Sequence, residues 1–119
     1  MERVAFLFNK APHGSSSGKE GLDAVLAMSA FNKEIALFFI GDGVLQLNYN
    51  QQPEVILARN YITTFSLLPL CDVTQYFICK ESLLTRGQKL NLERILPTTI
   101  LYTSMLYKKL ITYHHIISF

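Results

Sequence analysis

Cysteine is scarce in this chain, and its spacing argues against two classes of small protein. The 119 residues include two cysteines, Cys71 and Cys79, and no Cys-x-x-Cys motif. Two cysteines cannot form the disulfide framework of a small secreted domain, and no His or Cys pair has zinc-finger spacing. We therefore expect a reducing, cytoplasmic location, two free thiols and no metal site.

Charge is scarce as well. Charged residues make up 17% of the chain, hydrophobic residues make up 50%, and the net charge is +2. The lysines and arginines are scattered, which argues against direct nucleic-acid binding through a basic patch. A domain of this size buries about two-thirds of the surface of its unfolded chain. We therefore expect part of the apolar excess to lie in an interface with another subunit.

Long apolar runs are also missing. No stretch reaches the roughly 18 apolar residues that are needed to span a bilayer. The first apolar run ends at Asn9 and Lys10, so residues 1–9 do not resemble a signal peptide. The sequence thus predicts no membrane partner.

Short apolar segments alternate with helical patterns along the whole chain. The apolar segments predict five strands, at residues 2–9, 34–40, 72–79, 95–102 and 115–119. Helical periodicity predicts helices at 17–31, 54–68 and 80–86 and a last helix capped by Thr103 or Ser104. This order is typical of a single α/β domain, residues 1–119, with a mainly parallel five-stranded sheet and helices on both faces in a flavodoxin-like three-layer arrangement. We expect Leu26 and Phe38 in its core.

The stretch from Gln75 to Gly87, QYFICKESLLTRG, carries the clearest chemical signal. An apolar strand leads to Cys79, and a short helix follows at once and ends at Gly87. The helix N-terminus and Lys80 would both favour the thiolate, which is the nucleophilic form of cysteine. The other interpretation is that Cys79 is a small buried hydrophobic residue, as most free cysteines are.

Two further residues are candidate neighbours of Cys79. In a parallel sheet, the loops that follow the strands meet at the carboxyl edge. This rule brings His13, a candidate general base, and Asp42 close to Cys79. The alternatives are a surface histidine and a turn residue. The three loops concerned are 10–18, 41–43 and 79–81.

The segment GSSSGK, residues 14–19, suggests an anion- or nucleotide-binding loop. A P-loop has four residues between its glycines and a Ser or Thr after its lysine. Here three residues separate Gly14 from Gly18, and the lysine is followed by Glu20. Ser17 and Glu20 fit a capping box at the start of a helix instead, which favours a structural role.

Five segments follow one another along the chain in a specific order. They are RVAFLFNKAPHG, GKEGLDAVLA, ALFFIGDGVLQL, ILARNYITTFSLLPLCDV and ICKESLLTRG. Together they resemble the DsrF-like branch of the DsrE/DsrF family, from residue 2 to residue 87. The closing HIISF is similar to the last strand of the family, whereas residues 88–112 depart most from it.

The resemblance implies a role in tRNA modification. Members of the family pass sulfur, as a persulfide on cysteine, along a relay that ends in 2-thiouridine at the wobble position of tRNA. The implied assembly is a dimer of heterotrimers with B-type and D-type subunits, and sulfur leaves it through the D-type subunit. The resemblance implies no cofactor, no metal and no direct contact with nucleic acid.

The resemblance also bears on Cys79. The D-type subunit carries its sulfur-accepting cysteine after the third strand, and Cys79 is at the corresponding position. We expect a mainly structural interaction subunit, in which Cys79 is an inherited fold position. The alternative is a direct persulfide carrier through Cys79, and the second alternative is the anion- or nucleotide-binding module that the Gly/Ser segment suggests. Whether the chain is catalytic in its own right also stays open.

Overall fold

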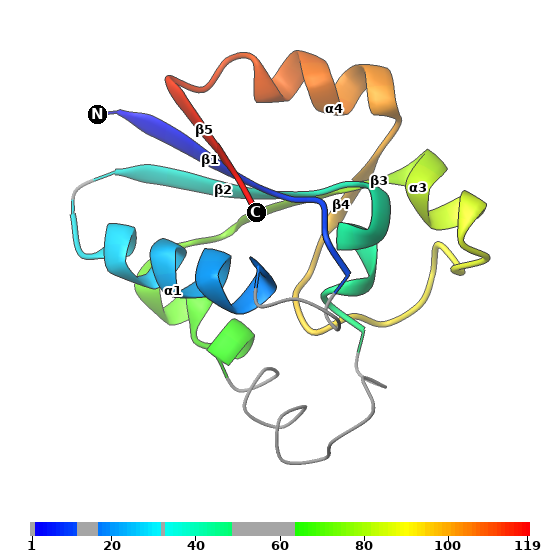
Figure 1. Ribbon diagram of the computed structural model, residues 1–119, viewed down its shortest axis with the longest axis horizontal. Helices are drawn as coiled ribbons and strands as arrows, with labels where there is room; N and C mark the ends of the chain where they lie inside the picture. The colour runs from blue at the N-terminus through cyan, green and yellow to red at the C-terminus, as the bar shows by residue number, and fades with distance from the viewer. Residues whose placement is uncertain (1, 12–16, 32, 49–63) are drawn as a thin grey trace.

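The computed structural model describes residues 2–11, 17–31, 33–48 and 64–119 (Figure 1). Its centre is a five-stranded sheet of order β4-β3-β2-β1-β5 in which every pairing is parallel. The strands are β1 (Arg3–Phe8), β2 (Glu34–Phe39), β3 (Gln75–Cys79), β4 (Thr99–Leu101) and β5 (His115–Ser118). The predicted α/β fold class is confirmed.

Helices cover both faces of this sheet. Figure 1 shows α1 on one side of the sheet, α4 on the other, and α3 beyond the end of β3. The helices are α1 (Ser17–Ser29), α3 (Lys80–Thr85) and α4 (Thr103–Leu110), with 3-10 helices η1 (Gly41–Leu45) and η2 (Leu68–Cys71). Most of the predicted helix 54–68 lies outside the described residues. Among the described residues, no helix is long and apolar enough to cross a membrane.

The two central strands form the core of the molecule. In β1 and in β2 every residue after the first is buried. Unbroken apolar strands of this kind are typical of parallel sheets that are covered on both faces. Aromatic rings connect neighbouring strands, with centroids 5.2 Å apart for Phe8 and Phe39 and 5.0 Å apart for Phe38 and Phe77.

The fourth strand is shorter than predicted. The sequence predicts a strand over residues 95–102, but β4 contains three residues and begins at Thr99. Pro97 has no N–H to donate to a strand ladder, and the N–H of Ile95 donates instead to the carbonyl of Leu47 at 2.9 Å. The chain therefore joins the sheet only after the proline.

A buried arginine organises the connection between α3 and β4. The guanidinium of Arg94 donates to the carbonyl oxygens of Leu92 at 3.0 Å, Lys89 at 3.1 Å and Leu90 at 3.4 Å. Burial lowers the pKa of Arg94. The side chain thus replaces water as the partner of carbonyls that a helix or strand would otherwise satisfy.

Helix α1 approaches the sheet most closely at a glycine. Leu22 and Val25 are buried, while Leu26 is only partly buried and lies at the margin of the core. A Cβ atom on Gly21 would lie 2.6 Å from Cε1 of Phe8. This glycine lets the helix backbone pack directly on the aromatic rings of the sheet.

A pair of truncations tests this description of the core. Phe38→Ala should lower the free energy of unfolding by about 3–5 kcal/mol, because it removes a fully buried ring. Leu26→Ala should cost less than about 2 kcal/mol, because solvent can fill part of the space that it leaves. Urea denaturation of both variants measures the difference, and equal losses would contradict the placement of Leu26.

A glycine is also required at position 43, where η1 passes close to the backbone of Phe8 at the end of β1. A Cβ on Gly43 would lie 1.9 Å from the carbonyl oxygen of Phe8. Gly43→Ala should therefore cost more than about 3 kcal/mol or prevent folding, because backbone must move.

Gly87 provides the matched control for this substitution. It has φ +66°, and a Cβ atom added to it would meet no other group within 4 Å. Gly87→Ala should therefore cost only about 1 kcal/mol, which is the penalty for a side chain in the left-handed region. Thermal unfolding compares the two variants, and similar losses would show that the contact at Gly43 is not limiting.

Candidate functional site

Cys79 lies at the junction of a strand and a helix. It is the last residue of β3, pairs with Leu101 of β4, and is the N-cap residue of α3. Its backbone is extended, with φ −76° and ψ 122°, as the strand-to-helix interpretation predicts. Helix α3 ends at Thr85 with Arg86 as its C-cap residue, and the positive φ of Gly87 allows the chain to leave the helix.

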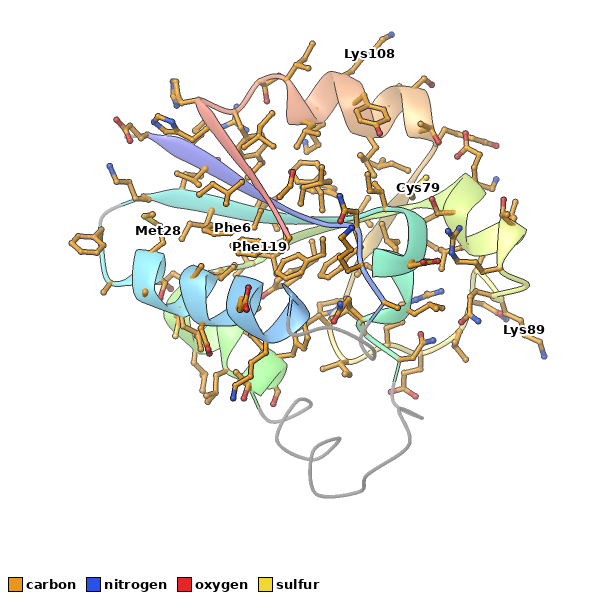
Figure 2. The ribbon with its side chains drawn as sticks, in the orientation of Figure 1. Phe6, Met28, Cys79, Lys89, Lys108 and Phe119 are labelled. Carbon is orange, nitrogen blue, oxygen red and sulfur yellow. The ribbon has the colours of Figure 1, made fainter. Side chains whose placement is uncertain are left out.

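The thiol of Cys79 is buried. Only 3% of the residue is exposed to solvent. Its Sγ lies 3.2 Å from the Oγ1 atom of Thr103, the first residue of α4. Figure 2 shows Cys79 in the region where the start of α3 approaches the start of α4. A sulfur donor could therefore react with this thiol only after Cys79 becomes more exposed.

Two polar contacts hold the starts of α3 and α4 together. The backbone N–H of Thr103 donates to both carboxylate oxygens of Glu81, at 2.9 and 3.1 Å. The Nζ of Lys80 donates to the hydroxyl of Tyr102 at 2.9 Å. We call these contacts, Glu81–Thr103 and Lys80–Tyr102, the α3–α4 clasp.

The charge of Glu81 strengthens the clasp. Desolvation acts to raise the pKa of Glu81, but hydrogen bonds from Thr103 and the charge of Lys80 outweigh it, so the pKa lies below its usual value. The ionised carboxylate faces the N-terminus of α4, where unpaired N–H groups concentrate positive charge. Tyr102, the N-cap residue of α4, makes no side-chain capping bond, so Glu81 takes that role.

The side chain of Asp42 pairs with Arg86, the C-cap residue of α3, rather than with Cys79. Its Oδ1 accepts a hydrogen bond and ion pair from Nε of Arg86 at 2.9 Å. The N–H of Gly41 donates to Oγ of Ser82 at 3.0 Å. The loop 41–43 and α3 therefore do meet at the carboxyl edge of the sheet, as the parallel topology predicts, but through Ser82 and the C-cap residue Arg86.

The remaining sequence predictions have different outcomes. His13 and residues 14–16 of the Gly/Ser segment lie outside the described residues, so a base for Cys79 and a phosphate loop stay predictions. Cys71 ends η2 and is partly buried against the core. Both cysteines are free thiols.

Sequence reasoning missed the contacts that join α3 to α4 beside Cys79. Thr103 is predicted as a capping residue for its own helix, but it is the first helical residue and is capped by Glu81. These two residues are 22 positions apart in the chain, so no local pattern relates them. The signal that could have found Glu81 is its position two residues after Cys79, on the first turn of α3.

The clasp predicts slow labelling of Cys79. In the native protein, an alkylating reagent should modify the partly buried Cys71 before it modifies Cys79. Glu81→Ala removes the carboxylate that caps α4 and should raise the labelling rate of Cys79 several-fold, while Cys71 serves as the internal reference. Peptide mass spectrometry over a time course measures both rates.

Glu93→Ala is the control, because Glu93 is an exposed carboxylate outside the clasp. It should leave the labelling rate of Cys79 unchanged. Labelling of Cys79 as fast as that of an unfolded peptide in the native protein would contradict the burial described above.

The sheet and the strand-end cysteine together define a class of protein. A parallel α/β protein of strand order 4-3-2-1-5 carries its candidate reactive group, a thiol, at the carboxyl edge of the sheet. The DsrE/DsrF-like family model matches residues 2–119. The chain belongs to this family, as the resemblance of its sequence segments predicts.

Curated relatives match the chain over its full length, and a solved structure has the same fold. The chain is 52% identical over 119 residues to "Protein TusC" from Buchnera aphidicola subsp. Acyrthosiphon pisum, in both strain Tuc7 and strain APS, and each match spans 100% of both chains. The crystal structure of the ychN protein from E. coli has a TM-score of 0.82 and 23% identity, with 100% of both chains covered. At that identity the structural match shows the fold alone.

Proposed function

We propose that this chain is a subunit of a cytoplasmic sulfur-relay complex that acts in 2-thiolation of the wobble uridine of tRNA. Its partners are TusB-like and TusD-like subunits in a dimer of heterotrimers, and the TusD-like subunit passes sulfur to the downstream acceptor. The proposal is supported by full-length similarity to proteins named TusC and by membership of the DsrE/DsrF-like family.

Within that complex, we assign the chain mainly a structural and interaction role. The observation that supports this assignment is the burial of Cys79, whose Sγ contacts Oγ1 of Thr103. Persulfide transfer requires a thiolate to attack the terminal sulfur of a donor persulfide, and the attacking sulfur must be accessible. In the described conformation the thiol of Cys79 faces Thr103 rather than solvent.

The alternative is a direct sulfur carrier through Cys79. The position of the thiol at the end of β3, at the carboxyl edge of the sheet, favours this second role. The step would be attack of the Cys79 thiolate on the outer sulfur of a donor persulfide. It would form the Cys79 persulfide and release the donor as a thiolate, without net oxidation. It would also require Cys79 to become more exposed.

The variant Cys79→Ser separates the two roles. With TusB-like and TusD-like subunits co-expressed, we expect the variant to assemble normally, because serine has nearly the size of cysteine. We expect tRNA thiolation at the wild-type rate, because the structural role does not use the thiol. After incubation with a persulfide donor, we expect no mass gain of about 32 Da, one sulfur atom, on Cys79 of the wild-type chain.

Cys71→Ser is the matched control for loss of a thiol elsewhere. If Cys79→Ser assembles normally but no longer supports tRNA thiolation, while Cys71→Ser still does, the carrier role is correct and the structural role is wrong. Failure of the wild-type chain to assemble with either partner would contradict the sulfur-relay proposal itself.

A further inference from the structure

Two hydrogen bonds join the start of β5 to the start of β1. The backbone N–H of His114 donates to the carbonyl oxygen of Arg3 at 2.9 Å. In the other direction, the backbone N–H of Arg3 donates to Nδ1 of the His114 ring at 2.8 Å. The register of the two parallel strands begins one residue later, with Val4 beside His115. His114 therefore closes this end of the β1–β5 ladder with both its backbone and its side chain.

The bond to the ring of His114 requires a neutral imidazole. Nδ1 can accept a hydrogen bond only while it carries no proton, so the proton of the neutral ring is on Nε2. In the imidazolium form both ring nitrogens are donors, and Nδ1–H would face the N–H of Arg3. Histidine is the side chain that ordinarily changes its charge between about pH 5 and pH 8. Within that range, protonation of His114 and the bond from Arg3 exclude each other.

The guanidinium of Arg3 binds groups other than the ring of His114. Its Nε pairs with Glu34 at 3.4 Å, and its Nη1 donates to the carbonyl and hydroxyl oxygens of Thr112 at 3.2 and 3.0 Å. Its Cζ also lies 4.2 Å from the ring centroid of Tyr113. These contacts hold the backbone of Arg3 beside β5 whatever the charge of His114.

Glu2 is the carboxylate that attracts a charged His114, but it has nearer partners. It pairs with Lys33 at 3.0 Å and with Nε2 of His115 at 3.4 Å. Lys33 lowers the pKa of Glu2 most, and the charge of His114 lowers it least. Among the described residues, the charged and titratable side chains around the starts of β1, β2 and β5 are Glu2, Arg3, Lys33, Glu34, Tyr113, His114 and His115. Since Lys33 pairs with Glu2 and Arg3 with Glu34, the hydrogen bond to Nδ1 decides which form of His114 fits.

The far end of β5 is attached by contacts that do not depend on histidine. The N–H of Phe119 donates to the carbonyl oxygen of Leu7 at 2.8 Å. The ring of Phe119 stacks on Phe6 and Phe8, with centroids 6.2 and 6.0 Å apart. Strand β5 is an edge strand that pairs with β1 alone among the described strands (Figure 1). Loss of the bond at its start therefore loosens one end of the strand and leaves the other end attached.

We propose that His114 is a pH-sensitive latch on the edge strand β5. Its neutral ring holds the start of β5 on β1, and uptake of a proton releases the N–H of Arg3. The bond stabilises the folded chain only while the ring is neutral, so its contribution is lost as the pH falls through the range in which histidine gains a proton. Opening exposes backbone N–H and C=O groups of β1, with which another strand can pair. The latch does not depend on the sulfur-relay role.

Residue-resolved amide hydrogen exchange of the full chain tests the latch. Between pH 8 and pH 5.5, the protection factors of the Arg3 and His114 amides should fall about fivefold, which is the contribution of one typical hydrogen bond. The amide of Phe119 is the internal reference and should keep its protection. Each factor is taken relative to the unfolded chain at the same pH, so the intrinsic pH dependence of exchange cancels.

Three substitutions separate the ring of His114 from other titrating groups. His114→Asn places Oδ1 where Nδ1 lies, and this acceptor does not titrate, so protection should persist at both pH values. His114→Gln has no acceptor at that position and should show at pH 8 the low protection of the wild type at pH 5.5. His115→Asn is the matched control and should keep the wild-type pH dependence, because His115 pairs with Glu2. His13 is unchanged in every variant.

Nitrogen NMR of the ¹⁵N-histidine-labelled chain gives a second measurement. At pH 8, the ring signals that disappear in His114→Asn should show a proton on Nε2 and none on Nδ1. A proton on Nδ1 would overturn the latch, and so would protection of Arg3 that does not fall in acid or falls equally in His114→Asn. A loss at Phe119 as large as the loss at Arg3 would also overturn it, because the whole strand rather than its start would then respond to acid.

Discussion

The structure depends on one constraint: the central strands β1 and β2 are covered on both faces, so they can carry almost no polar side chain. Parallel pairing with matched register then brings the ends of these strands to one edge of the sheet. The loops that follow must turn within very little space. Gly43 meets this demand, since its backbone passes against the carbonyl of Phe8 where no side chain would fit. Burial in the centre thus determines the geometry at the edge, where Asp42 and Cys79 are found.

The edge has two regions with different kinds of contact. Around η1, an ion pair from Arg86 and a hydroxyl of Ser82 connect the loop after β2 to α3. Around Cys79, a carboxylate and an ammonium group connect α3 to the beginning of α4. Helix α3 belongs to both regions. With six residues it is too short to be stable alone, so these contacts and the burial of Leu83 must hold it in place.

Much of this arrangement could be predicted from the sequence, because it depends on local patterns. Apolar runs predict β1 and β2 to within one or two residues, and the apolar stretch before Cys79 predicts the end of β3 and the start of α3. Most of the failures involve contacts between distant segments, and one is a local effect of proline. Leu26 has the right spacing for the core but lies at its margin, and Pro97 delays β4. Cys79 is buried where Thr103, which is 24 positions away in the chain, contacts its thiol. Local patterns therefore predict the position of the thiol but not its accessibility.

The buried arginine in the connection after α3 has a consequence for how that connection responds to solution conditions. Arg94 is bound by backbone carbonyl oxygens. These oxygens carry no net charge, so they are not protonated in acid and do not attract counterions. Arg86, at the other end of the same connection, is bound by the exposed carboxylate of Asp42. Concentrated salt should screen the second contact and leave the first almost untouched. In the connection after α3, the Arg86–Asp42 contact should therefore weaken as ionic strength rises, whereas the contacts of Arg94 should not.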